Sequence, residues 1–217
     1  QIICPDKINT EQWLEVMRNA HSVGLRSTAT IMFGHVDGPA HWARHLNQVR
    51  TLQTQTGGFT EFVPLPFVHM ESPLYRKGWA RPGPTYREAL LMHAVPRLVL
   101  NPGITNIQTS WVKMGPDGSK ACLAAGANDL GGTLMNESIT RAAGADFGQE
   151  LPPEAMEKLI RASQRIPEQR TTFYAEAPTE RSQQSFGADA LEANINTAPG
   201  ARKSHSRSEI VRFGPSQ

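Results

Sequence analysis

The sequence predicts an α/β fold that is half of a (β/α) TIM-type barrel, with about four parallel strands, outer helices and a further C-terminal helix. Segments with helical and strand periodicity alternate from residue 10 to residue 135. The connections between them are short, as right-handed parallel β/α units require. No Gly-x-Gly-x-x-Gly motif follows a predicted strand, which favours a barrel over a dinucleotide-binding sheet.

Glycine and proline bound the elements expected in the first hundred residues. A helix with Thr10 as its N-cap should end at Gly24, and a Pro at the start of the next helix suits its first turn. The Thr- and Ile-rich run after Gly24 is typical of a buried strand. In chain order we expect a helix from Thr10, a strand over 26–33, a helix over 39–56, a strand over 59–68, and a helix over 85–100 that Pro96 kinks or splits.

The second half continues the alternation and then changes in composition. We expect a strand over 106–114, an Ala-rich helix over 119–129, a short strand over 131–135, an amphipathic helix over 152–165 and an extended piece over 171–175. From Pro178 to Gln217 the residues are mostly Ser, Gln, Asn, Ala and Arg, which bury too little surface to offset chain entropy. The sequence therefore predicts a half-barrel domain over 1–177 and a disordered low-complexity tail over 178–217.

Composition excludes several classes of function. Lys and Arg number 22 against 20 for Asp and Glu, so no strong field would attract nucleic acid or a membrane surface. No apolar run approaches the roughly 20 residues that cross a bilayer. Cys4 and Cys122 stand in unrelated contexts, which predicts neither a disulfide framework nor a cysteine metal site. A reducing, cytoplasmic compartment is expected.

The first residues look like the end of a strand. The chain opens with Gln1 and an apolar stub that runs into Pro5, with no helix cap before it. We interpret this as the start of a piece cut from a longer chain, although processing could also produce a Gln terminus.

Polar residues that follow the predicted strands are the candidates for chemistry, because barrel active sites lie at the carboxyl ends of the strands. Any one of them could equally be an ordinary solvated loop residue. The candidates, in chain order, are Gly34, His35, Asp37, His69, Met70, Glu71, Trp111, Lys113, Met114, Asn136 and Glu137.

Histidine spacing gives little support for a metal site. A lone histidine after a strand, such as His35, is more often a hydrogen-bonded neighbour than a ligand. His41 and His45 have the i, i+4 spacing of a zinc clasp, but no Glu follows His41 and the helix looks like a packing element. We expect no metal ligand in this chain.

Several segments resemble the tyrosine-using subunit of deazaflavin (FO) synthase, the CofH type of the radical S-adenosylmethionine (SAM) superfamily. The resemblance covers about residues 2–177. The segments that carry it are Ile3–Ile8, Ala20–His21, Ser27–His35, Arg50–Gln53, Thr56–Phe59, Phe62–Phe67, Gln108–Val112 and Gly131–Glu137.

The resemblance implies an enzyme that joins a tyrosine-derived 4-hydroxybenzyl group to 5-amino-6-(D-ribitylamino)uracil. Such an enzyme uses SAM and a [4Fe–4S] cluster held by a Cys-x3-Cys-x2-Cys loop, and acts with a second, CofG-like subunit or fused domain. This chain has no such cysteine triplet, so the resemblance places it in the carboxyl-terminal half of the enzyme and predicts that the fragment alone is inactive.

The resemblance also suggests roles for individual residues. In radical SAM barrels a Gly-x-x-Glu turn packs against the adenosyl part of SAM, and here the turn starts at Gly34 and carries Asp in place of Glu. The roles are SAM contact for Met32, Phe33, Gly34 and Asp37, substrate contact for Glu71, Trp111, Lys113 and Asn136, and catalysis for His35 and Glu137.

Two alternatives remain open from the sequence. The radical SAM enzymes of the futalosine route to menaquinone share the Thr-Ala-Thr strand, the Thr-Gly-Gly-Phe turn and the Ser-Trp piece, although residues 3–8 and 31–35 favour the deazaflavin enzyme. The missing cysteines also fit a truncated, non-catalytic binding module.

Overall fold

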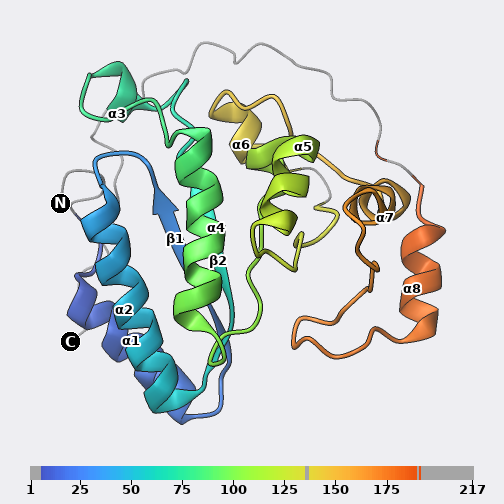
Figure 1. Cartoon of the computed structure of the whole chain (residues 1–217), viewed down its shortest axis with the longest axis horizontal. Coiled ribbons are helices and arrows are strands. Elements are labelled where there is room, and N and C mark those ends of the chain that lie inside the picture. The colour runs from blue at the N-terminus through green and yellow to red at the C-terminus, as the bar shows by residue number, and fades with distance from the viewer. Residues whose placement is uncertain (1–5, 135–136, 190, 192–217) are drawn as a thin grey trace, which may run out of the picture.

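The computed structural model describes residues 6–134, 137–189 and 191 and shows a mixed α/β arrangement around a small parallel sheet (Figure 1). Asn136, one of the predicted substrate residues, lies outside the described residues. The elements are α1 (Thr10–Ser22), β1 (Ser27–Phe33), α2 (Pro39–Thr56), β2 (Phe59–Pro66), α3 (Pro73–Arg76), α4 (Tyr86–Leu100), α5 (Trp111–Ala124), α6 (Ile139–Ala142), α7 (Pro153–Ala162) and α8 (Thr179–Phe186).

The sheet places four chain segments side by side in sequence order. Strands β1 and β2 pair in parallel, with Thr28 opposite Glu61 and Met32 opposite Leu65. Two isolated parallel bridges continue this order, because Phe62 of β2 pairs with Ile107 and Gln108 pairs with Asp129. The two predicted strands of the first half are therefore confirmed. The third is reduced to the bridges at Ile107 and Gln108, and the fourth segment, Asp129, lies before the strand expected over 131–135.

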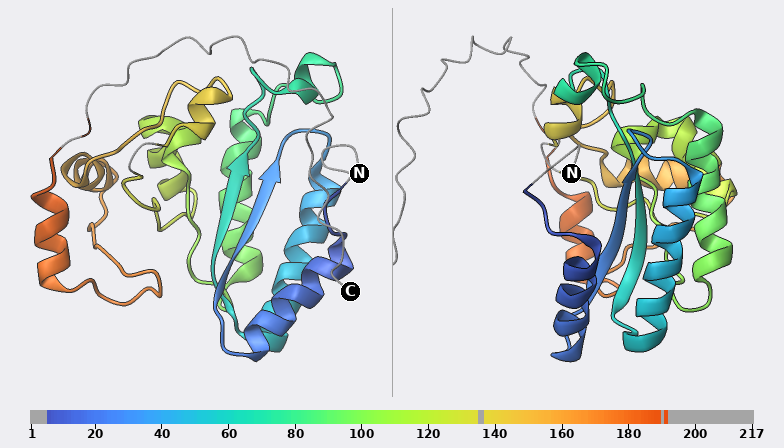
Figure 2. Two further views of the ribbon diagram at one scale, coloured as in Figure 1. Left: turned by 180° about the vertical axis from the view of Figure 1, so that it is seen from behind. Right: turned by 90° about the vertical axis from the view of Figure 1, so that its left-hand side faces the viewer.

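Helices α2 and α4 cover one face of the sheet and form the main core with it (Figure 2). Alternate residues of β1, Ala29 and Phe33, point into this core and are fully buried. The opposite face of β1 carries Thr28, Thr30 and Met32, which are exposed. The fully or nearly fully buried residues of this core include Phe33, Val49, Leu52, Phe62, Leu100, Ile104 and Ile107.

The strand expected over 106–114 is mostly wrong. Helix α5 begins at Trp111, and it is kinked at Gly115, whose φ of 65° and ψ of 178° are not helical. The Ile107 N–H donates to the side-chain Oδ1 of Asn128 at 2.8 Å, whereas in a regular strand it would donate to a backbone carbonyl. The helix expected over 119–129 accordingly starts earlier and ends at Ala124, and the described part of the strand expected over 131–135 is irregular.

Other element boundaries differ from expectation in detail. The N-cap of α1 is Asn9 rather than Thr10, because the Asn9 side chain accepts from Gln12 and the Gln12 side chain accepts from Asn9. Pro96 does not split α4, which continues to Leu100.

The last described segments form a hairpin and a helix. Residues 171–175, expected to be extended, form the turn of this hairpin, closed by an antiparallel bridge between Arg170 and Glu176. Helix α8 occupies the start of the segment expected to be a disordered tail. Within the described residues, no helix has the length and apolar character needed to span a membrane.

Candidate functional site

The loop after β1 is held by the carboxylate of Asp37. One of its oxygens, Oδ1, accepts from the backbone N–H groups of Gly34 and His35, each at 2.8 Å, and Oδ2 accepts from the indole of Trp42. Burial alone would raise the pKa of Asp37, but the bonds from Trp42 and the His35 backbone outweigh it, so the pKa is lowered. Asp37 is thus an ionised internal cap of this loop.

His35 is fixed in one tautomer by the same loop. Its Nε2 donates to the Met32 carbonyl at 3.2 Å, and its Nδ1 accepts from the Val36 N–H at 2.7 Å. The same Nδ1 lies 3.4 Å from Oδ1 of Asp37, so the imidazole and the carboxylate are held side by side in this loop.

Close backbone packing explains the glycine in this loop. The φ of Gly34 is +91°, and a Cβ there would come within 2.4 Å of Cδ of Pro84. The neighbouring Phe33 ring packs edge-on against Trp42 inside the core. The carbonyl oxygens of Phe33 and His35 already accept from later loops. Of the four residues expected to contact SAM, Met32 therefore offers the most accessible side chain, with 44% exposure.

A second group at the carboxyl end of the sheet joins α5 to α6 through three side chains. Nζ of Lys113 donates to Oγ1 of Thr140 at 3.3 Å, and this hydroxyl donates to Oε1 of Glu137 at 2.9 Å. The Thr140 N–H also donates to Oε1 at 3.0 Å. Burial lowers the pKa of Lys113, and the negative charge of Glu137 acts against that shift.

Trp111, the first residue of α5, and Glu71, in the loop after β2, brace this group. The indole of Trp111 donates to the Gly132 carbonyl at 3.0 Å, and its side chain is buried. The Glu71 N–H donates to the Ala143 carbonyl at 3.0 Å, while its half-exposed carboxylate pairs with Arg76. The structure thus brings Lys113 and Glu137 together. His35 has a separate set of hydrogen-bond partners.

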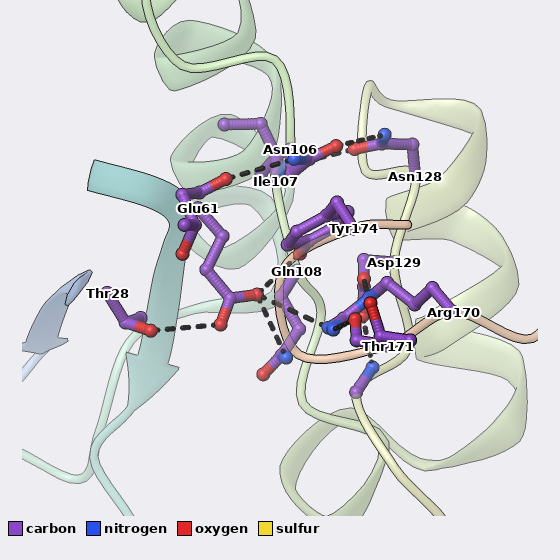
Figure 3. Close-up of polar contacts among 12 residues, drawn as sticks. Thr28, Glu61, Asn106, Ile107, Gln108, Asn128, Asp129, Arg170, Thr171 and Tyr174 are labelled. Atoms are coloured by element: carbon purple, nitrogen blue, oxygen red, sulfur yellow. Dashed lines mark hydrogen bonds and ion pairs between the residues drawn. The ribbon is translucent and has the colours of Figure 1, made fainter. Parts of the chain in front are cut away.

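A third polar group, which the sequence analysis missed, lies around Glu61, on the sheet face that also carries Thr28 (Figure 3). At its centre, Oε2 of Glu61 accepts from the Tyr174 hydroxyl at 2.7 Å and from Gln108 at 3.3 Å. Its other oxygen accepts from Thr28 at 3.0 Å. Arg170 lies 3.6 Å from Glu61 and is paired more closely with Asp129.

The hairpin over 170–176 supplies two members of this group. The Arg170 guanidinium lies 3.9 Å from the centroid of the Tyr174 ring, and Tyr174 has a φ of 62°, uncommon for a residue with a side chain. Burial and the bond to Glu61 raise the pKa of Tyr174, so its phenol stays protonated. Burial would lower the pKa of Arg170, but the hydrogen bond and the negative charge of Asp129 outweigh burial. The pKa of Arg170 is therefore raised.

One signal in the sequence could have revealed part of this group. Glu61 is a charged residue inside an apolar strand, two positions after a core phenylalanine, and a buried charge requires a partner. Nothing in the local pattern of residues 170–174 identifies that partner, because the hairpin is more than 100 residues away in sequence.

The described residues contain no group of three or more His, Cys, Asp or Glu side chains able to hold a metal ion. Cys122 is buried in a smaller apolar cluster with Leu123, Leu130 and Leu159, and burial raises the pKa of its thiol. Cys4 lies outside the described residues. The donor set of the described chain therefore does not fit an iron–sulfur cluster.

Comparison with known proteins defines the family to which this α/β chain belongs. Residues 56–183, which include Lys113, Glu137, Glu61 and the hairpin, match the family model described as CofH/MqnC C-terminal region. The chain belongs to this family.

Named relatives are about half identical to the chain. It is 51% identical over 172 residues to the 5-amino-6-(D-ribitylamino)uracil–L-tyrosine 4-hydroxyphenyl transferase of Methanopyrus kandleri, which covers 79% of this chain and 47% of the relative. It is 51% identical over 174 residues to the FO synthase of Mycobacterium leprae, covering 80% of this chain and 20% of the relative. The Methanothermobacter thermautotrophicus transferase is 47% identical over 175 residues, 81% of this chain and 48% of the relative. The chain thus spans between a fifth and a half of the length of these relatives.

Proposed function

We propose that the chain is the carboxyl-terminal half of a radical SAM transferase that joins a tyrosine-derived 4-hydroxybenzyl group to 5-amino-6-(D-ribitylamino)uracil. The observation that carries this proposal is the 51% identity to a relative named for that transfer, over 79% of this chain. The matched family region contains Lys113, Glu137 and Glu61, so the likeness extends beyond the packing core.

The sheet supports a half-barrel in this proposal. Four parallel segments follow one another in chain order, and α2 and α4 lie on one side only. The exposed face with Thr28, Thr30 and Met32 would then line the interior of the barrel. The remaining strands would come from the rest of the enzyme, and residues 1–177 would form this domain with residues 178–217 as its tail.

The cofactors enter the proposal through the rest of the enzyme. The described residues offer no ligand set for a [4Fe–4S] cluster. SAM and such a cluster, held by the rest of the enzyme, would supply the radical chemistry. In this half, Met32 would contact SAM by packing, and Asp37 would act by fixing the loop that holds His35 and Gly34. The enzyme would work in a reducing cytoplasm with a CofG-like partner.

The family model also bears the name of a second enzyme, MqnC, so the menaquinone route stays an alternative. The relatives at 47–51% identity carry the FO synthase and transferase names, which favours the deazaflavin reaction.

The test is a paired assay on the full-length enzyme that contains this chain, reconstituted anaerobically. We expect a tyrosine–uracil adduct, detected by mass spectrometry, only when tyrosine and 5-amino-6-(D-ribitylamino)uracil are both present. Omission of either substrate is the control. Turnover of a futalosine-route substrate without adduct formation would overturn the proposal in favour of the alternative.

A further inference from the structure

We propose that Lys113 and Glu137 form a clamp for the charged α-amino-acid end of the substrate tyrosine, with Thr140 as the positioning residue between them. Glu137 would accept from the substrate ammonium, and Lys113 would donate to the substrate carboxylate. This assignment rests on the proposed function and names the part of the substrate that this site recognises.

The two charged groups approach each other without forming a direct ion pair. Thr140 stands between them, accepting from Lys113 at 3.3 Å and donating to Glu137 at 2.9 Å. A free amino acid carries the same two charges on one carbon atom, in the form of an ammonium and a carboxylate. If the amino acid lies alongside the clamp, its ammonium faces Glu137 and its carboxylate faces Lys113. Each substrate charge then meets its complement, and the complex gains no net charge.

Both ends of the clamp keep unused capacity for a ligand. The Lys113 ammonium has three N–H donors, of which Thr140 takes one. Oε2 of Glu137 is buried and has no hydrogen-bond partner among the described residues, although Oε1 of the same carboxylate has two. A buried carboxylate oxygen without a partner is costly, and a native structure keeps few of them without a role.

The clamp is held rigidly enough to select a ligand. Thr140 is 4% exposed and belongs to α6, and Glu137 exchanges two backbone hydrogen bonds with Gln149, each at 3.0 Å. Lys113 lies in the first turn of α5, and its ammonium donates to the Thr140 hydroxyl. The partner substrate, a ribitylaminouracil, carries no ammonium–carboxylate pair, so the clamp distinguishes tyrosine from it.

Equilibrium binding to the full-length protein tests the clamp with three probes. These are L-tyrosine, tyramine, which lacks the carboxylate, and 3-(4-hydroxyphenyl)propionate, which lacks the ammonium. By titration calorimetry, Lys113→Met should weaken tyrosine about 10- to 100-fold and leave tyramine unchanged. Glu137→Gln should weaken tyrosine about 10- to 100-fold and leave the propionate unchanged.

Thr140 provides a separate readout. Thr140→Ser keeps the hydroxyl and should bind tyrosine like the wild type, whereas Thr140→Val removes it and should weaken tyrosine and both analogues. The matched controls are Lys120→Met and Glu157→Gln, two partly exposed charges of α5 and α7 that pair with Asp117 and Arg161. Neither control should change the affinity for tyrosine.

The outcomes separate the clamp from the proposed function. If Lys113→Met weakens tyrosine and tyramine equally while circular dichroism matches the wild type, the clamp is wrong. Wild-type tyrosine affinity in both charge variants also overturns it, even where the adduct forms. Conversely, if the wild type binds a different amino acid in preference to tyrosine, with the same loss in the two variants, the clamp stands and the proposed substrate falls.

Discussion

At the scale of single residues, buried histidines are the groups whose protonation opposes folding. His45 lies largely buried against Phe62, and its Nε2 has no hydrogen-bond partner among the described residues. Burial lowers the pKa of His45 from 6.5 to about 4. It also lowers the pKa of His93, which is fully buried, so both rings are neutral in the folded chain at neutral pH.

We predict that His45 makes the protein sensitive to acid. The unfolded chain takes up the proton near pH 6.5 and the folded chain only near pH 4, so stability is complete above pH 6.5 and falls as the pH drops between these values. The loss should reach about 3 kcal/mol. Urea unfolding of His45→Leu at pH 7 and pH 4.5 should show a smaller fall than the wild type. The exposed His41→Leu is the control, and an equal fall in His45→Leu would contradict this account.

At the scale of elements, the sequence predicted best those helices and strands that glycine or proline bounds. Strand β1 lies between Gly24 and Gly34, and α2 begins at Pro39 and ends before Gly57, which adopts the left-handed conformation. These elements are confirmed because their boundaries depend on local backbone preferences that glycine and proline fix.

Elements decided by distant contacts could not be predicted. The run Trp111-Val112-Lys113-Met114 fits a strand as well as one turn of helix, because so short an apolar run has no diagnostic period. Its helical form depends on the Trp111 contact with Gly132, and the bridge at Ile107 depends on Asn128. In the candidate site, too, groups that depend on distant contacts could not be predicted. Lys113 and Glu137 were predicted from their places after strands, whereas the Glu61 group needed the hairpin.

The hairpin over 170–176 should stabilise the fold through the side chains of Arg170 and Tyr174. Arg170→Ala would leave the carboxylates of Asp129 and Glu61, which are 6% and 13% exposed, without their shared cation. We expect a loss of about 3 kcal/mol in the free energy of unfolding. Tyr174→Phe removes only the hydroxyl bonded to Glu61 and should cost about 1 kcal/mol.

Chemical denaturation of both variants measures these losses. Arg181→Ala, an exposed arginine in α8, is the control and should change stability by less than about 0.5 kcal/mol. If Arg170→Ala proves as stable as this control, the hairpin does not hold the sheet face.

At the scale of the whole molecule, the parallel sheet has one face covered by helices and one face that is polar and partly open. Thr30 and Met32 of β1 are exposed on that open face, although parallel sheets are normally covered on both sides. The half-barrel that we propose would account for this, because the remaining strands of the barrel would enclose the open face. The central claim is therefore that this chain supplies one half of a transferase barrel.

The most direct test replaces the carboxyl-terminal part of the Methanopyrus kandleri transferase, to which this chain is 51% identical, with the matching residues of this chain. If the account is right, the reconstituted chimera forms the tyrosine–uracil adduct, and the same chimera with Lys113→Met forms it with a raised KM for tyrosine. A chimera that folds like the parent but forms no adduct, under conditions in which the parent forms it, would contradict the account.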